Sequence, residues 1–178
     1  MINNLKDIPI GKDINNIACV SEFTNEDYKE FRLAGIKPVF ENEKFYFQDY
    51  PTSFGNHIWT ERAIFGVIDN TVYKMSVQTD LVDKIKCDEV FNRIKNHVVQ
   101  ATVSSPIIEN ENKISWNFND GNILLHRINH FGMNLINLTV TSSLIRDKYT
   151  PKVTKSIFLN YIQSLALSKI ILSLFKKT

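Results

Sequence analysis

Glycine, proline and cysteine are all scarce in this chain of 178 residues, with 6, 5 and 2 occurrences respectively. So few glycines and prolines exclude a collagen-like chain and long low-complexity stretches. The two cysteines, Cys19 and Cys87, are too few for a disulfide framework and too far apart for a zinc motif. A hydrophobic core must therefore hold the fold, and a chain of this length can bury one.

The chain also lacks an excess of charge of one sign, since 21 Lys and Arg residues stand against 19 Asp and Glu residues. Nucleic-acid-binding domains carry a concentrated basic face, so this balance disfavours nucleic acid as a partner. Residues Met1 to Asp7 lack the apolar segment and cleavage site of a secretory signal. We therefore expect a soluble cytoplasmic protein, of the kind found in bacteria.

Recognisable catalytic motifs are absent from the sequence. It contains no glycine-rich phosphate loop, no nucleophile elbow and no His-Glu-x-x-His zinc motif. His126 and His130 have the spacing of metal ligands on a helix, but their surroundings predict a strand, where four residues span about 13 Å. We therefore expect no catalytic residue, no metal and no cofactor. A hydrolase using His57, Glu61 or His126 stays open as an alternative.

Hydrophobic periodicity is what the sequence does contain. Apolar residues recur at steps of three and four from Asp83 to Ala101, which predicts an amphipathic helix. Thr24-x-x-Asp27 resembles a capping box and predicts a short helix over 25–34. Alternating apolar and polar residues predict strands at 71–79, 113–118, 122–129 and 134–142. The dipeptide Asp69-Asn70 predicts a tight hairpin before the first of them.

The order of these elements, one helix and then about three strands, occurs twice. It predicts an α+β domain over residues 1–150, with one antiparallel sheet of about six to seven strands and the helices on one face. This order of elements is similar to that of β-lactamase-inhibitor proteins, which bind with a concave sheet. The resemblance implies that one sheet face of this protein is a binding surface.

The second face of the sheet is the candidate binding surface. If Tyr73, Met75, Val77 and Trp116 face the helices, the opposite face carries Val72 and a mixture of aliphatic, basic and amide groups, which is typical of protein interfaces. The alternative is a sheet face that is solvated or covered by the C-terminal segment. The candidate partner-binding residues are Arg62, Ile64, Lys74, Ser76, Gln78, Asn117 and Arg127.

Residues 151–178 form the second unit, predicted as an apolar C-terminal helix. From Ile157 to Phe175 apolar residues point almost all around a helical wheel, so the helix must be buried in protein or lipid. Its length fits a bilayer, but Lys169 near its centre disfavours insertion. It is expected to pack on the same domain or on a partner, with a membrane anchor or an interfacial helix as alternatives.

Together these features predict a non-enzymatic protein-binding module, specifically an inhibitor or immunity-type protein that neutralises a partner protein. Two alternatives are a membrane-attached accessory protein and an unrecognised hydrolase. A second copy of the chain is also admissible as the partner.

Overall fold

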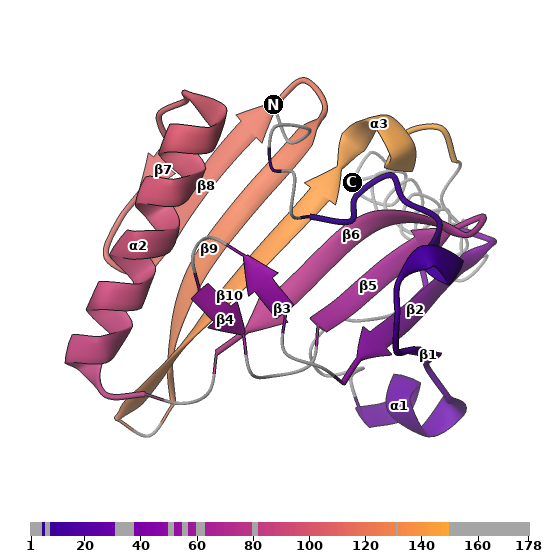
Figure 1. The fold of residues 1–178 in the computed structure, drawn as a ribbon, viewed down its shortest axis with the longest axis horizontal. Coiled ribbons are helices and arrows are strands. Elements are labelled where there is room, and N and C mark those ends of the chain that lie inside the picture. Colours follow the sequence, from indigo (N-terminus) through magenta and orange to yellow (C-terminus); the bar gives the residue numbers. More distant parts are fainter. Residues whose placement is uncertain are drawn as a thin grey trace, which may run out of the picture.

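The computed structural model describes residues 5, 8–30, 38–49, 52–54, 57–59, 63–79, 82–130 and 132–149. Within these ranges the protein is an α+β fold built on one antiparallel sheet of eight strands, in the order β1-β2-β5-β6-β10-β9-β8-β7. A separate two-stranded hairpin, β3-β4, accompanies it (Figure 1). The predicted fold class is confirmed, and the sheet is wider than predicted.

The extra width comes from very short strands. The two edge strands, β1 and β7, contain three and two residues, too few for a clear alternating pattern. The strands of the main sheet are β1 (Val20–Glu22), β2 (Glu43–Gln48), β5 (Ala63–Ile68), β6 (Thr71–Gln78), β7 (Ile108–Glu109), β8 (Lys113–Phe118), β9 (Gly121–His130) and β10 (Met133–Ser142). The small hairpin consists of β3 (Thr52–Phe54) and β4 (His57–Trp59).

Local signals set the ends of several elements. Asp69 and Asn70 both have positive φ, 47° and 63°, as the tight turn between β5 and β6 requires. Helix α2 (Lys84–Thr102) begins after Asp83, whose carboxylate accepts from the Lys86 N–H at 2.9 Å. These observations confirm the predicted hairpin and amphipathic helix.

The first helix, α1 (Asn25–Glu30), begins with the predicted capping box. The Thr24 N–H donates to Asp27 Oδ2 at 2.7 Å, and the Asp27 N–H donates to Thr24 Oγ1 at 3.3 Å. Two backbone N–H groups at the helix start are thus satisfied reciprocally. Residues 31–34 of the predicted helix lie outside the described residues.

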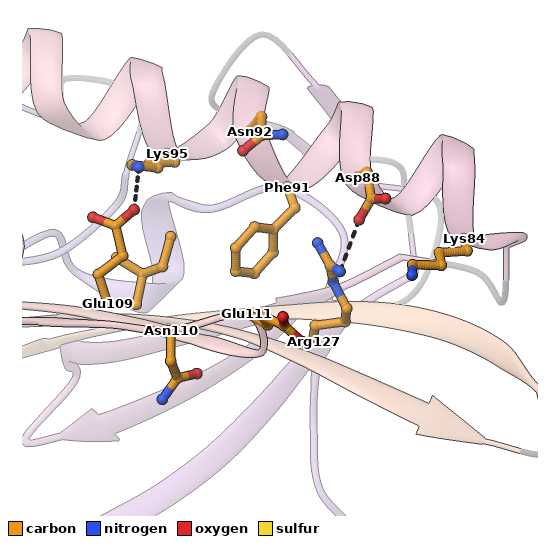
Figure 2. Close-up of a pocket in the computed structure, with 10 residues that line it drawn as sticks. Lys84, Asp88, Phe91, Asn92, Lys95, Glu109, Asn110, Glu111 and Arg127 are labelled. Atoms are coloured by element: carbon orange, nitrogen blue, oxygen red, sulfur yellow. Dashed lines mark hydrogen bonds and ion pairs between the residues drawn. The ribbon is translucent and has the colours of Figure 1, made fainter.

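Helix α2 packs on one face of the sheet. Its buried residues, among them Phe91, Ile94 and Val98, share one core with side chains of β6, β8, β9 and β10. Asp88 extends from α2 to Arg127 on β9, with 2.7 Å between the charged atoms (Figure 2). The apolar stripe read from the sequence is therefore the surface that holds α2 to the sheet.

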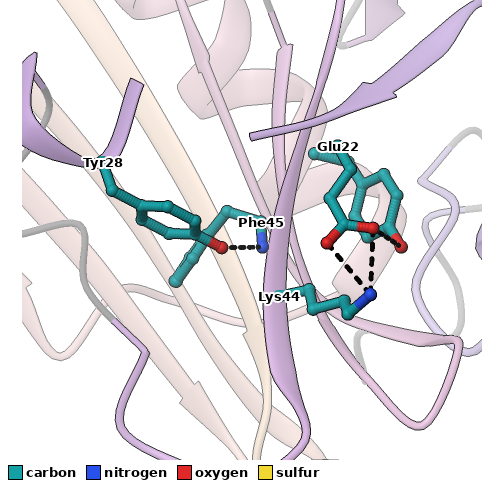
Figure 3. A network of polar contacts seen from close by, with 5 residues as sticks. Glu22, Tyr28, Lys44 and Phe45 are labelled. Atoms are coloured by element: carbon teal, nitrogen blue, oxygen red, sulfur yellow. Dashed lines mark hydrogen bonds and ion pairs between the residues drawn. The ribbon is translucent and has the colours of Figure 1, made fainter. Parts of the chain in front are cut away.

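Helix α1 packs at the opposite face, contrary to prediction. Tyr46 of β2 contacts the core beneath α2, so its neighbours Phe45 and Phe47 point to the other face. The Phe45 N–H donates to Tyr28 Oη of α1 at 3.1 Å. Figure 3 shows Tyr28 on one side of β2 and the pair Glu22–Lys44 on the other.

The physical reason for the placement of α1 is an aromatic cluster that the linear pattern does not reveal. Phe23, two residues before the start of α1, lies 6.1 Å from Phe45 and 5.7 Å from Phe47 between ring centroids. Tyr28 lies 5.5 Å from Phe23. Burial of these rings holds α1 over the edge strand β1 and its neighbour β2.

A β-bulge reverses the predicted sides of two residues in β6. The register shifts between Gly66 and Val67, so that Val67 pairs with Val72 while Gly66 pairs with Lys74. The extra residue, Tyr73, turns away from α2 and packs with Phe40, whereas Val72 joins the core under α2. The prediction that Tyr73 faces the helix and Val72 the opposite side was therefore wrong, because a bulge interrupts strict alternation.

Gly66 is required at this bulge by the ring of Tyr73. A Cβ at this position would lie 2.9 Å from Tyr73 Cε1 and 3.2 Å from Lys74 Cβ. We expect Gly66→Ala to lower the free energy of unfolding by about 1–3 kcal/mol in urea denaturation. The loss should shrink in a Tyr73→Ala background; an undiminished loss would exclude the clash as its cause.

Candidate functional site

The face of the sheet opposite α2 carries the candidate site, which we call the open face. Pairing across the strands arranges its side chains in rows perpendicular to the strand direction. The upper row contains Lys74, Thr141, Asn122 and Asn117. The middle row contains Phe47, Ile64, Ser76, Thr139, Leu124 and Ser115. The lower row contains Gln78, Asn137, His126 and Lys113, and the last contains Leu135 and Ile128.

Five of the seven residues predicted from the sequence lie together on this face. The upper, middle and lower rows hold Ile64, Lys74, Ser76, Gln78 and Asn117. Of these, Asn117 is exposed and the other four are half-buried. Arg62 lies outside the described residues.

Arg127 does not belong to the open face, because it shares the α2 side of β9 with Ile123 and Leu125. Its guanidinium forms the ion pair with Asp88 and lies 4.7 Å from the centre of the Phe91 ring. Its side chain is only 13% exposed. Arg127 therefore links α2 to β9. The alternation of side chains along β9 could have predicted that it faces α2.

A groove of about 470 Å³ lies beside the Arg127–Asp88 ion pair, between α2 and strands β7 to β9. Figure 2 shows Lys95 of α2 reaching Glu109 of β7, which forms a second ion pair across the groove. The groove carries three basic and three acidic side chains, so its charge is balanced. The two ion pairs of the groove join helix and sheet.

The open face also contains residues that sequence reasoning missed. Leu124, Leu135 and Ile128 place aliphatic groups on it, and Ile128 is 38% exposed. The sequence could have indicated these residues, because Leu124 and Leu135 each stand next to an apolar residue of the other face and so break the alternation. Consecutive apolar residues in a strand indicate that both faces are apolar at that point.

Three polar side chains at the centre of the open face bind one another. Ser76 Oγ lies 3.1 Å from Thr139 Oγ1, and both hydroxyls reach Asn137 Oδ1, at 3.4 and 3.0 Å. These contacts fix the three side chains across β6 and β10. They also direct the N–H groups of the Asn137 amide away from the two hydroxyls.

The two described cysteines differ in their surroundings. Burial raises the pKa of the Cys87 thiol, which favours the protonated, unreactive form. Cys19, in contrast, is exposed. Both His126 and His130 belong to β9, as predicted. No group of three or more potential metal ligands occurs among the described residues.

No helix in the described part of the chain is both long and apolar enough to cross a membrane. The predicted C-terminal helix, from Ile157 to Phe175, lies outside the described residues, as does the whole unit 151–178. His57 and Ile58 are described as part of β4, but only through their backbone.

The arrangement of the open face offers groups that are suited to binding. It combines aliphatic side chains, fixed hydroxyls and amide donors on a rigid sheet. Comparison of the chain with known protein families, with curated proteins and with solved structures finds no match.

Proposed function

We propose that this protein is a non-enzymatic protein-binding module, of the inhibitor or immunity type, which neutralises a partner protein through its open face. The observation that carries the proposal is the central band of this face, where Ile64, Ser76, Thr139 and Leu124 lie side by side on four adjacent strands. All four are half-buried. Together they form a surface without charged side chains.

The composition of the band supports protein binding. The cores of protein interfaces are depleted in charged residues and combine apolar area with a few placed hydrogen-bonding groups. On the open face the lysines, Lys74 and Lys113, lie in the rows on either side of the central band. A charge-poor centre with a charged surround is the usual arrangement of an interface.

The rigidity of the band supports it further. Ser76 and Thr139 are held by each other and by Asn137, so binding would order few additional side chains. Each rotamer-rich side chain that must be immobilised costs about 0.5–1.5 kcal/mol of affinity. A pre-ordered sheet surface avoids much of this cost.

The test is a single substitution at the centre of the band. Ser76→Arg places a long charged side chain between Ile64 and Thr139. We expect tagged wild-type protein to retain one protein stoichiometrically from a lysate of its source organism, and Ser76→Arg to retain at least about tenfold less. Quantitative mass spectrometry of the eluates measures the ratio.

Asn96→Arg is the matched control, because Asn96 is exposed on α2, which packs on the other face. It should retain the partner as the wild type does. Equal unfolding midpoints of both variants in urea would show that neither change unfolds the domain. Undiminished retention by Ser76→Arg would refute binding through the open face.

A further inference from the structure

The lower row of the open face is a line of hydrogen-bond donors. Gln78 pairs with Asn137, Asn137 with His126, and His126 with Lys113, so the four side chains lie on adjacent strands β6, β10, β9 and β8. Four neighbouring strands span about 14 Å. Amide, imidazole and ammonium groups therefore follow one another along a straight line.

The Asn137 amide is oriented for donation. Its Oδ1 accepts from the hydroxyls of Ser76 and Thr139 on the side of the central band. The two hydroxyls thus engage its oxygen and not its N–H groups, which are the donors of the amide. Lys113, at the end of the row, is exposed and forms no ion pair among the described residues.

The four rows of the open face carry charge of one sign, and Glu43, which lies on the same face beyond them, is buried and accepts from Tyr73. The described residues of the rows include Lys74 and Lys113 but no aspartate or glutamate. On the other face, by contrast, the basic groups Arg127 and Lys95 are paired with carboxylates. A complementary partner must therefore supply the negative charge that these rows lack.

Aliphatic side chains border the row of donors on both sides. Leu124 lies in the row above, and Leu135 and Ile128 lie in the row below. Same-face rows along a strand are about 7 Å apart, so the donors and the aliphatic groups fall within one binding element. The complementary element has carboxylates flanked by apolar side chains.

We propose that the element recognised by the open face is an acidic, amphipathic protein segment, whose carboxylates bind along Gln78, Asn137, His126 and Lys113. This proposal rests on the proposed function and names the chemistry of its partner. The apolar side chains of the segment pack on Leu124 and Leu135. A nucleic acid fits less well, because the face has only two lysines and flanks its donors with aliphatic groups.

The experiment uses defined probes and the full chain. A fluorescent 16-residue peptide of glutamate and leucine is compared with its counterpart carrying lysine for each glutamate, and with a mixed-sequence single-stranded DNA of 16 nucleotides. Fluorescence anisotropy at low salt measures the Kd of each probe. We expect the acidic peptide to bind at least about tenfold more tightly than either other probe.

Lys113→Glu should raise the Kd of the acidic peptide by about five- to tenfold, because it places a carboxylate at the end of the row. Lys86→Glu is the matched control: Lys86 is exposed on α2, and the change in net charge is the same. It should change the Kd by less than about twofold.

Equal binding of the acidic and basic peptides, no binding of the acidic peptide, tighter binding of the DNA, or equal losses in both variants would each overturn the proposal. The proposed function stands or falls separately. If Ser76→Arg releases a cellular partner that Lys113→Glu retains, the open face binds protein but not through carboxylates.

Discussion

Glu43→Ala is expected to lower the free energy of unfolding by about 3–5 kcal/mol, because three hydrogen-bond donors lose the carboxylate that accepts from all of them in a buried site. The Glu43 side chain is buried, and Oε2 accepts from the Val39 N–H and from the Phe40 N–H. Oε1 accepts from the hydroxyl of Tyr73. Alanine removes this acceptor, and each buried donor left unpaired costs about 1–3 kcal/mol.

Tyr73 contributes to the size of this effect. Burial, together with the hydrogen bond to Glu43, raises the pKa of its phenol, so the hydroxyl stays protonated and donates. The ring of Tyr73 also packs edge-on against Phe40, at 6.2 Å between centroids. Loss of Glu43 therefore loosens the contact between the loop before β2 and the bulge in β6.

Glu43→Gln is the control, because its amide oxygen still accepts the two backbone N–H groups while its NH₂ donates to Tyr73 Oη. It should cost about 1 kcal/mol. Urea denaturation followed by circular dichroism measures both variants. Equal losses for alanine and glutamine would show that the charge, and not the acceptor geometry, stabilises the site.

Trp116→Ala is expected to cost about 3–5 kcal/mol, the range for removal of a large aromatic side chain from a core. Trp116 lies on β8 and is fully buried. It belongs to the core shared with α2, together with Ile94 and Ile123. Its removal leaves a cavity where α2 meets the sheet.

Trp116→Phe separates the loss of volume from the loss of the indole N–H. Nε1 of Trp116 is buried and has no hydrogen-bond partner among the described residues, so phenylalanine sacrifices no such contact. We expect a loss of at most about 2 kcal/mol, again from urea denaturation. A loss as large as that of alanine would point to the indole N–H as the stabilising group.

The sequence predicted the central elements of the sheet well, because their signals are local. The alternation of Ile136, Leu138 and Val140 with polar residues predicted β10, and all three are fully buried. The Asp69-Asn70 turn joins β5 and β6 as its type requires. The edge strand β7 was missed because its two residues carry no measurable period.

The candidate site was predicted in part. Ile64, Lys74, Ser76 and Gln78 were placed on one face by alternation along β6 and its neighbour, and the register confirms their rows. Arg127 was grouped with them on the strength of its residue type alone. Its position in β9, two residues from Leu125, is what assigns it to the other face.

The sequence by itself determined the fold class, the ends of α2 and the alternation of the long strands, since all three depend on residues within a few positions of one another. Only the tertiary structure decided which face each helix covers and where Tyr73 points. Contacts of Phe23 with Phe45 and Phe47 hold helix α1, and a hydrogen bond to Glu43 holds Tyr73. The residues in these contacts are about 20 to 30 positions apart. A short-range pattern carries no record of such contacts, and one bulge at Gly66 suffices to exchange the two faces for the residues beyond it.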